Sequence, residues 1–286
     1  MAVHGGAWNI PDELWPAHQE GCKAAYQAGY SILEKGGSAV DAIVAAMCVL
    51  EDDPVFDAGY GSFLNEAGQV ELDAGLMEGK DLRSGAVLGV SKIKNPIRLA
   101  RLVMDQTDHC IFTHDGAHSL ANRHGMEMVD PAIHIHERER DILERIKSGD
   151  SSILETAWAS SHDTVGAIAM DSEGNLAAGN STGGVLNKMV GRIGDAPLIG
   201  QGFYADNERG AFVCTGWGEA LMRSATGMYA LDALSRNSPG DAARAAIDHL
   251  ARRVNGYGGV LLMTPRGDCA VAHNTQRMAW YTGSEI

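Results

Sequence analysis

Two pairs of short apolar segments, each pair separated by a short turn sequence, restrict the fold of this chain more than any other feature. Residues 164–171 and 175–180 are joined by Asp-Ser-Glu-Gly, and residues 258–264 and 268–273 by Thr-Pro-Arg-Gly. Apolar runs joined by such turn residues are typical of β-hairpins. The sequence therefore predicts antiparallel strand pairs in the second half of the chain.

The rest of the pattern predicts helices in pairs and further strands. Because regular β-α-β alternation is missing, we expect stacked sheets with helices outside, a four-layer α/β/β/α sandwich, rather than a doubly wound parallel sheet. The 286 residues are expected to form one domain, 1–286. Helical spacing and turn signals predict helices at 13–35, 39–51, 96–106, 116–124, 137–147, 218–234 and 239–255, and strands at 2–8, 69–74, 85–91, 110–113 and 210–215.

Charge and cysteine content narrow the class of protein. The formal net charge is −14, so no basic field is present to attract nucleic acid. The five cysteines are scattered, without a C-x-x-C pair, which favours reduced thiols in a cytoplasmic protein. The amino terminus shows no secretory signal pattern, and no apolar run reaches the roughly 20 residues that span a bilayer. We therefore expect a cytoplasmic protein with neither a nucleic-acid nor a membrane partner.

Thr164 stands at the head of the apolar run 165–170 and follows a loosely patterned segment, 148–163, that is rich in Ser and Asp. We expect this segment to be a flexible linker. A hydroxyl placed in this way suggests a nucleophile that the chain exposes by cutting itself. The free α-amino group of the new first residue would supply the base, because its intrinsic pKa lies near 8. The alternative is a threonine that only begins a strand.

Three polar clusters later in the chain have side chains that suit the same chemistry. Thr182 follows the next strand and could bond to Thr164. Arg192 and Asp195 form an opposite-charge pair that suits a zwitterionic amino acid. Thr215 and Gly216, where a strand turns into a helix, could form an oxyanion hole. Each cluster also has a structural alternative: a sheet pair, a surface ion pair or a plain turn.

Seven motifs in this order resemble one family, the plant-type L-asparaginases/isoaspartyl peptidases, which are N-terminal nucleophile hydrolases. The resemblance runs from His4 to about Gly259. The motifs are HGGAW at 4–8, GKDLRSGAV at 79–87, the strand that begins at Thr164, STGG at 181–184, GRIGDAP at 191–197, YADN at 204–207 and CTGWGE at 214–219.

The resemblance implies a function for each cluster. The chain would cleave itself between Asp163 and Thr164, leaving fragments of 163 and 123 residues. Thr164 would then attack the side-chain amide of asparagine or the isopeptide bond of β-aspartyl dipeptides. Thr182 would support the nucleophile, and Thr215 and Gly216 would form the oxyanion hole. The substrate-binding positions implied by the motifs are Arg192, Asp195, Gly216 and Gly218.

The resemblance also implies an ion and a partner. No cofactor is expected for catalysis, but the loop from Leu50 to Tyr60 resembles one that binds a structural sodium ion through backbone carbonyls, an oxygen set suited to a hard cation. The carbonyls that bind the sodium ion would come from Leu50, Glu51, Asp53, Phe56, Ala58 and Tyr60. Cleaved protomers are expected to form a homodimer.

Two positions depart from the family pattern. Asp57 stands where relatives often have Asn, so it is a candidate modulator of the nucleophile. Asp163 replaces a common Gly, and His-Asp-Thr resembles the sister glycosylasparaginases, which split the GlcNAc–Asn bond. Two alternatives therefore stay open: a glycosylasparaginase-like activity, and a relative that does not process itself and binds a metabolite.

Overall fold

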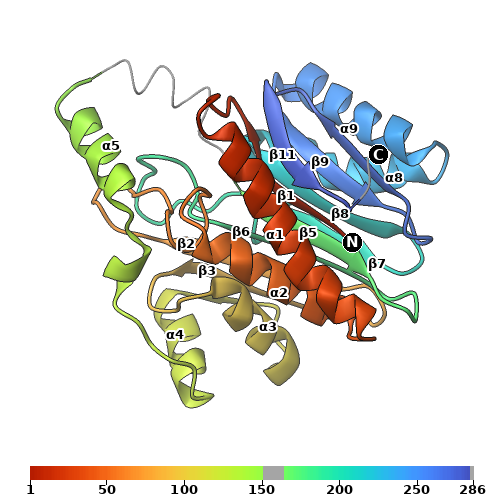
Figure 1. Ribbon diagram of the computed structural model, residues 1–286, viewed down its shortest axis with the longest axis horizontal. Helices are drawn as coiled ribbons and strands as arrows, with labels where there is room; N and C mark the ends of the chain where they lie inside the picture. The colour runs from red at the N-terminus through yellow and green to blue at the C-terminus, as the bar shows by residue number, and fades with distance from the viewer. Residues whose placement is uncertain (151–163, 284–286) are drawn as a thin grey trace.

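Two stacked β-sheets form the centre of the molecule in a computed structural model that describes residues 1–150 and 164–283 (Figure 1). The first sheet has the strand order β11-β1-β5-β6-β2-β3-β4 and the second has the order β10-β9-β8-β7. All neighbouring strands pair antiparallel except β3 and β4. The first sheet consists of β1 (Ala2–Trp8), β2 (Leu72–Glu78), β3 (Ser84–Val90), β4 (Ile111–Thr113), β5 (Val165–Met170), β6 (Leu176–Thr182) and β11 (Arg277–Tyr281), and the second of β7 (Phe203–Asp206), β8 (Gly210–Gly216), β9 (Gly258–Met263) and β10 (Cys269–His273).

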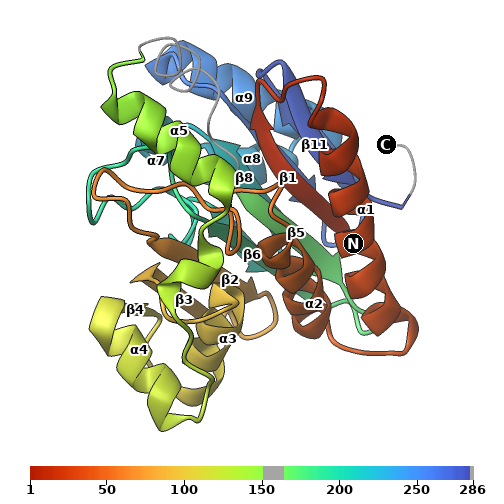
Figure 2. The same ribbon diagram turned by 60° about the vertical axis from the view of Figure 1, so that its left-hand side comes forward.

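Helices cover the outer face of each sheet, as Figures 1 and 2 show from two directions. Helices α1 (Trp15–Glu34), α2 (Ala39–Asp52) and α3 (Pro96–Gln106) pack on the first sheet, and α7 (Gly218–Ser224), α8 (Thr226–Leu234) and α9 (Pro239–Val254) pack on the second. The predicted four-layer α/β/β/α sandwich is therefore confirmed. The other helices of the described residues are α4 (His114–Arg123), a 3₁₀ turn (Pro131–His134) and α5 (Glu137–Lys147).

Three buried apolar clusters correspond to the three interfaces between these four layers. Neighbouring residues of one strand belong to different clusters: Ala167 packs under the helices, whereas Ile168 lies between the sheets. This alternation is the two-residue period of a strand buried on both faces. It also fixes which polar side chains of these strands point into the layer between the sheets.

Several predicted elements are confirmed by local signals. Ser38 caps α2 by accepting the Asp41 N–H at 3.0 Å, and Pro96 opens α3. The hairpin turn between β5 and β6 closes through a Gly174 N–H bond to the Asp171 carbonyl at 3.1 Å. The predicted linker 148–163 lies mostly, and Asp163 entirely, outside the described residues.

Two predictions of local structure are wrong, and two strands were missed. The strand expected at 69–74 begins at Leu72 and continues to Glu78, through Gly75. The single helix expected at 218–234 is two helices, because Ala225 adopts a left-handed conformation with φ of 49°. Strands β7 and β11 were not predicted.

In the described part of the chain, no helix is both long and apolar enough to cross a membrane.

Candidate active site

Three of the predicted threonines face the layer between the sheets. Thr164 directly precedes β5, Thr182 ends β6 and Thr215 lies near the end of β8. Side chains an even number of positions apart on a strand point to the same face. Each threonine is an even number of positions from a residue of its own strand that packs between the sheets, so it faces that layer. Val165 pairs with Ser181, so Thr164 and Thr182 occupy the same end of the first sheet. The threonines are buried, with exposed fractions of 6%, 2% and 0%.

Asp57 contacts Thr182 from the glycine-rich loop. The Thr182 hydroxyl lies 3.5 Å from one Asp57 carboxylate oxygen and accepts the Gly184 N–H at 2.9 Å. The other Asp57 oxygen accepts the Phe63 N–H at 2.8 Å, and the Asp57 carbonyl accepts the Gly183 N–H at 2.9 Å. The carboxylate that departs from the family pattern is thus adjacent to the hydroxyl predicted to support Thr164.

A histidine and an asparagine, neither of which was predicted to take part, brace the two strands behind Thr164. His4 and Asn180 both pair with Gly166, whose absent side chain leaves room for the His4 Nε2 and Asn180 Oδ1 atoms. Asn180 donates to the carbonyls of Gly202, which precedes β7, and of Cys214 in β8, at 2.8 and 3.0 Å. Burial lowers the pKa of His4 to about 3, against the opposing effects of Asn180 and the Thr164 backbone, so the imidazole is neutral.

The same asparagine bond positions the predicted oxyanion hole. Cys214, whose carbonyl accepts from Asn180, precedes Thr215 and Gly216. Gly216 has φ of 134°, and a Cβ there would lie 2.4 Å from the Gly258 Cα atom, so only glycine fits. The buried Thr215 hydroxyl has no hydrogen-bond partner within the described ranges. A buried donor of this kind is available to a substrate oxygen.

The predicted substrate anchors meet at the start of α7. Glu219, which was not predicted to contribute, accepts from Arg192 Nε at 2.9 Å and from Arg192 Nη2 at 3.0 Å. Arg192 therefore forms its ion pair with Glu219, and none is found between Arg192 and Asp195 in the described residues. Asp195 is 3% exposed, and one of its carboxylate oxygens finds no partner in residues 1–150 and 164–283.

Burial sets the charge of the second anchor. Desolvation raises the pKa of Asp195 to about 7, although the nearby Arg192 acts in the opposite direction. Gly218 lies against both anchors, since a Cβ on it would be 2.9 Å from Asp195 Oδ1 and 3.1 Å from Arg192 Nη2. A cation and an ionisable acid thus lie together beside the oxyanion segment, an arrangement that suits an α-amino acid.

The predicted cation loop contains neutral oxygens that fit a monovalent ion. The Glu51 carbonyl accepts the Tyr60 N–H at 2.8 Å, and the Asp53 carbonyl accepts the Phe56 N–H at 3.2 Å, which leaves a second lone pair on each oxygen. Burial raises the pKa of the Glu51 carboxyl to about 8, so it adds little charge at neutral pH. The six predicted ligand positions, Leu50, Glu51, Asp53, Phe56, Ala58 and Tyr60, surround Asp57 in the sequence.

Two cavities of the described structure lie apart from the threonines. One, of about 370 Å³, borders the cation loop and is lined by Glu51, Tyr60 and His134 among others. A larger one, of about 570 Å³, lies between the end of α8 and the β9–β10 turn. Because the larger cavity contains none of the threonines or anchors, we do not assign the chemistry to it.

The stacked sheets between helices are the fold of the N-terminal nucleophile hydrolases. The profile of the Asparaginase family matches residues 1–285. An isoaspartyl peptidase/L-asparaginase of Bos taurus is 44% identical over 282 residues, which cover 98% of this chain and 91% of the relative. The protein of that name from Xenopus laevis is 43% identical over the same length, covering 98% and 90%. A plant-type L-asparaginase of Pyrobaculum calidifontis is 40% identical over 298 residues, covering 100% and 98%. The chain belongs to the asparaginase family.

Proposed function

We propose that this protein is a threonine amidohydrolase that converts L-asparagine to L-aspartate and ammonia and cleaves β-aspartyl dipeptides. The observation that carries the proposal is the convergence of Thr164, Thr182 and Thr215 beside the Arg192–Asp195 anchor pair. The names of the relatives support both substrate classes. Arg192 would bind the α-carboxylate of the substrate, and Asp195 its α-ammonium group.

Cleavage of the bond between residues 163 and 164 would supply the base. The freed α-amino group of Thr164 takes the proton of its own hydroxyl as the oxygen attacks the side-chain carbonyl carbon. The Thr215 hydroxyl and the Gly216 N–H donate to the oxygen that becomes negative. Ammonia, or the amine of a dipeptide, leaves with a proton from the ammonium group. Water then hydrolyses the acyl ester, releasing aspartate and restoring Thr164.

Three further features belong to the same proposal. A sodium ion held by the carbonyls of residues 50–60 would stiffen the loop that places Asp57 against Thr182. Cleaved protomers would pair into a homodimer. The protein would act in the cytoplasm, where scattered reduced thiols such as the buried Cys22 and Cys214 persist.

Purified protein tests the proposal directly. We expect ammonia release from L-asparagine and amine release from a β-aspartyl dipeptide, with GlcNAc–Asn as the comparison substrate. A denaturing gel should show two fragments, with Thr164 found by N-terminal sequencing. A single intact band without hydrolysis would support a metabolite-binding protein instead, and preferred release from GlcNAc–Asn would support a glycosylasparaginase.

The oxyanion role of Thr215 gives a separate prediction. Thr215→Val keeps the shape of the side chain and removes the hydroxyl, so kcat should fall about 100-fold or more while KM changes little, because the lost bond forms mainly in the transition state. Steady-state kinetics on fully cleaved protein measure both constants. An unchanged kcat would remove Thr215 from the oxyanion hole.

A further inference from the structure

The segment that carries Arg192 has little regular structure of its own. Residues 183–191 leave β6 as a series of turns, and Met189 and Val190 are 71% and 54% exposed. Backbone groups of such a segment need partners from elsewhere. Residues 64–66 supply some of these partners. The Asn187 N–H bonds to the Leu64 carbonyl at 3.0 Å, and the Glu66 N–H bonds to the Lys188 carbonyl at 2.8 Å.

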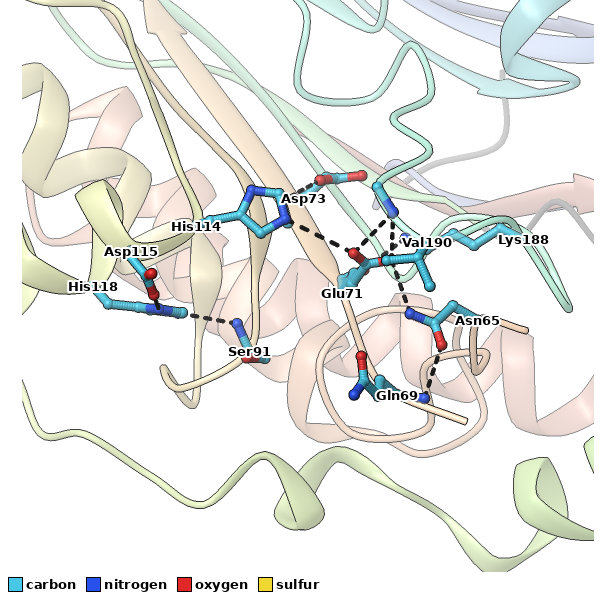
Figure 3. Close-up of polar contacts among 12 residues, drawn as sticks. Asn65, Gln69, Glu71, Asp73, Ser91, His114, Asp115, His118, Lys188 and Val190 are labelled. Carbon is cyan, nitrogen blue, oxygen red and sulfur yellow. Dashed lines mark hydrogen bonds and ion pairs between the residues drawn. The ribbon is translucent and has the colours of Figure 1, made fainter. Parts of the chain in front are cut away.

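Glu71 holds the segment at two further points, immediately before Arg192 (Figure 3). Its carboxylate accepts the Gly191 N–H, with distances of 3.0 and 3.1 Å to the two oxygens. The backbone carbonyl of Glu71 accepts a hydrogen bond from Lys188 Nζ at 2.8 Å, and Lys188 is only 3% exposed. The Arg192 N–H in turn bonds to the Met189 carbonyl at 3.0 Å. Glu71 therefore holds both ends of the turn at residues 188–191, which leads directly into Arg192.

The Glu71 carboxylate is itself fixed before any substrate arrives. Asn65 Nδ2 donates to one of its oxygens at 3.0 Å, and Asn65 Oδ1 accepts the Ala67 and Gln69 N–H groups at 3.0 and 2.9 Å. His114 Nε2 lies 3.8 Å from the other oxygen, as Figure 3 shows. Glu71 is 7% exposed, so its charge acts at short range with little screening by solvent.

A second buried acid, Asp73, lies near Lys188 and beside the threonines. Asp73 pairs directly with Thr182 across β2 and β6, and its Oδ1 accepts the Gly89 N–H at 2.8 Å. Burial raises the pKa of Asp73 to about 6, against the opposing effects of Lys188, the Gly89 N–H and Arg192. Glu71, Asp73 and Lys188 are thus buried beside Arg192, whose side chain is 16% exposed. These charged groups stabilise the backbone of the anchor segment in one arrangement.

We propose that Glu71 is a positioning residue for substrate binding: by holding the Gly191 N–H it fixes the backbone from which Arg192, whose guanidinium also pairs with Glu219, reaches the substrate carboxylate. The inference rests on the proposed function, since it concerns the same anchor. Glu71 acts through the backbone of residue 191 and touches no reacting atom. Its loss should therefore weaken binding of any ligand with an α-carboxylate and leave the acyl-transfer step nearly intact.

A double-mutant cycle on fully cleaved protein tests this role. Glu71→Ala should raise KM for L-asparagine about tenfold, with kcat changed less than about threefold, because a charge-assisted bond is lost. The dissociation constant of L-aspartate, measured by calorimetry, should rise equally. In an Arg192→Ala background the same substitution should add less than about twofold, because the two residues act in series. Glu71→Gln, which keeps an acceptor oxygen, should recover part of the affinity.

Glu66→Ala is the matched control on the same loop. Glu66 accepts the Val190 N–H at 3.4 Å and is exposed, so its removal should change KM less than about twofold. A Glu71→Ala effect of equal size with and without Arg192, or a loss confined to kcat, would overturn the inference while leaving the amidohydrolase intact. Wild-type protein without hydrolysis or L-aspartate binding would overturn both. If Glu71→Ala does not fold, Glu71→Gln should still weaken L-aspartate binding, and an unchanged affinity in that variant would also refute the inference.

Discussion

The Thr164→Ala variant is expected to lose hydrolysis by about 10⁴-fold or more, because the substitution removes the attacking oxygen and leaves no other nucleophile in its place. Cleavage at residue 163 should stop as well, since the same hydroxyl would attack the preceding carbonyl. The chain should still fold, because Thr164 precedes β5 and its side chain forms no part of the apolar core between the sheets. Ammonia release and a denaturing gel measure the two losses.

Two companion variants make this result specific. Thr164→Ser keeps a hydroxyl on the same backbone and should retain cleavage and measurable hydrolysis. Ser181→Ala removes a buried hydroxyl from the position of β6 next to Thr182, on the opposite face of the strand, near Glu51 of α2. It should change kcat only slightly. A cleaved and active Thr164→Ala variant would refute the nucleophile assignment.

Much of the fold was predictable because its signals are local. The β5–β6 turn, the Ser38 cap and the Pro96 helix start each depend on a few neighbouring residues. The strand predicted at 69–74 stopped short of Gly75, which lies inside β2. A Cβ at this position would lie 2.4 Å from the Phe203 ring of the second sheet, so the glycine makes room for sheet packing.

Other elements depend on contacts that the sequence does not show. Strand β11 exists as the edge partner of β1, from the opposite end of the chain. Strand β7 has four residues and pairs only with β8 in the sheet order. Ala225 breaks the α7–α8 region in a conformation that alanine seldom adopts, and the packed helices on either side impose it.

The site was predictable as a set of residues but not as a network. The order of motifs indicated Thr164, Thr182 and Thr215, yet nothing in it paired Arg192 with Glu219 or placed Asp57 against Thr182. An asparagine within the apolar strand at 176–182 was a signal for the Asn180 brace, since a buried amide needs partners. The burial that raises the pKa of Asp195 has no counterpart in local sequence.

Asp195→Asn should weaken substrate binding about 100-fold or more while making the protein more stable at pH 8. The lost carboxylate is the proposed partner of the substrate ammonium group, and removal of one member of such a pair costs about 2–5 kcal/mol. The pKa of Asp195 is raised from its ordinary 3.8 to about 7 in the folded protein. The folded state therefore binds the proton more tightly than the unfolded state, and stability falls as pH rises from about 4 to 7. The side-chain amide of the Asp195→Asn variant carries no charge, so this loss of stability should not occur in the variant.

The pH dependence separates these two effects of Asp195 from the chemistry of Thr164. In the wild type, affinity for L-aspartate should rise as Asp195 ionises between about pH 6 and 8, whereas kcat reports the Thr164 amine in the bound complex. Asp195→Asn should abolish that rise. By denaturant unfolding, its gain should be on the order of 1 kcal/mol or more at pH 8 and should shrink toward pH 4. Equal destabilisation at both pH values would mean that the Asp195 charge stabilises the fold through Arg192, and the buried acid would then be ionised throughout.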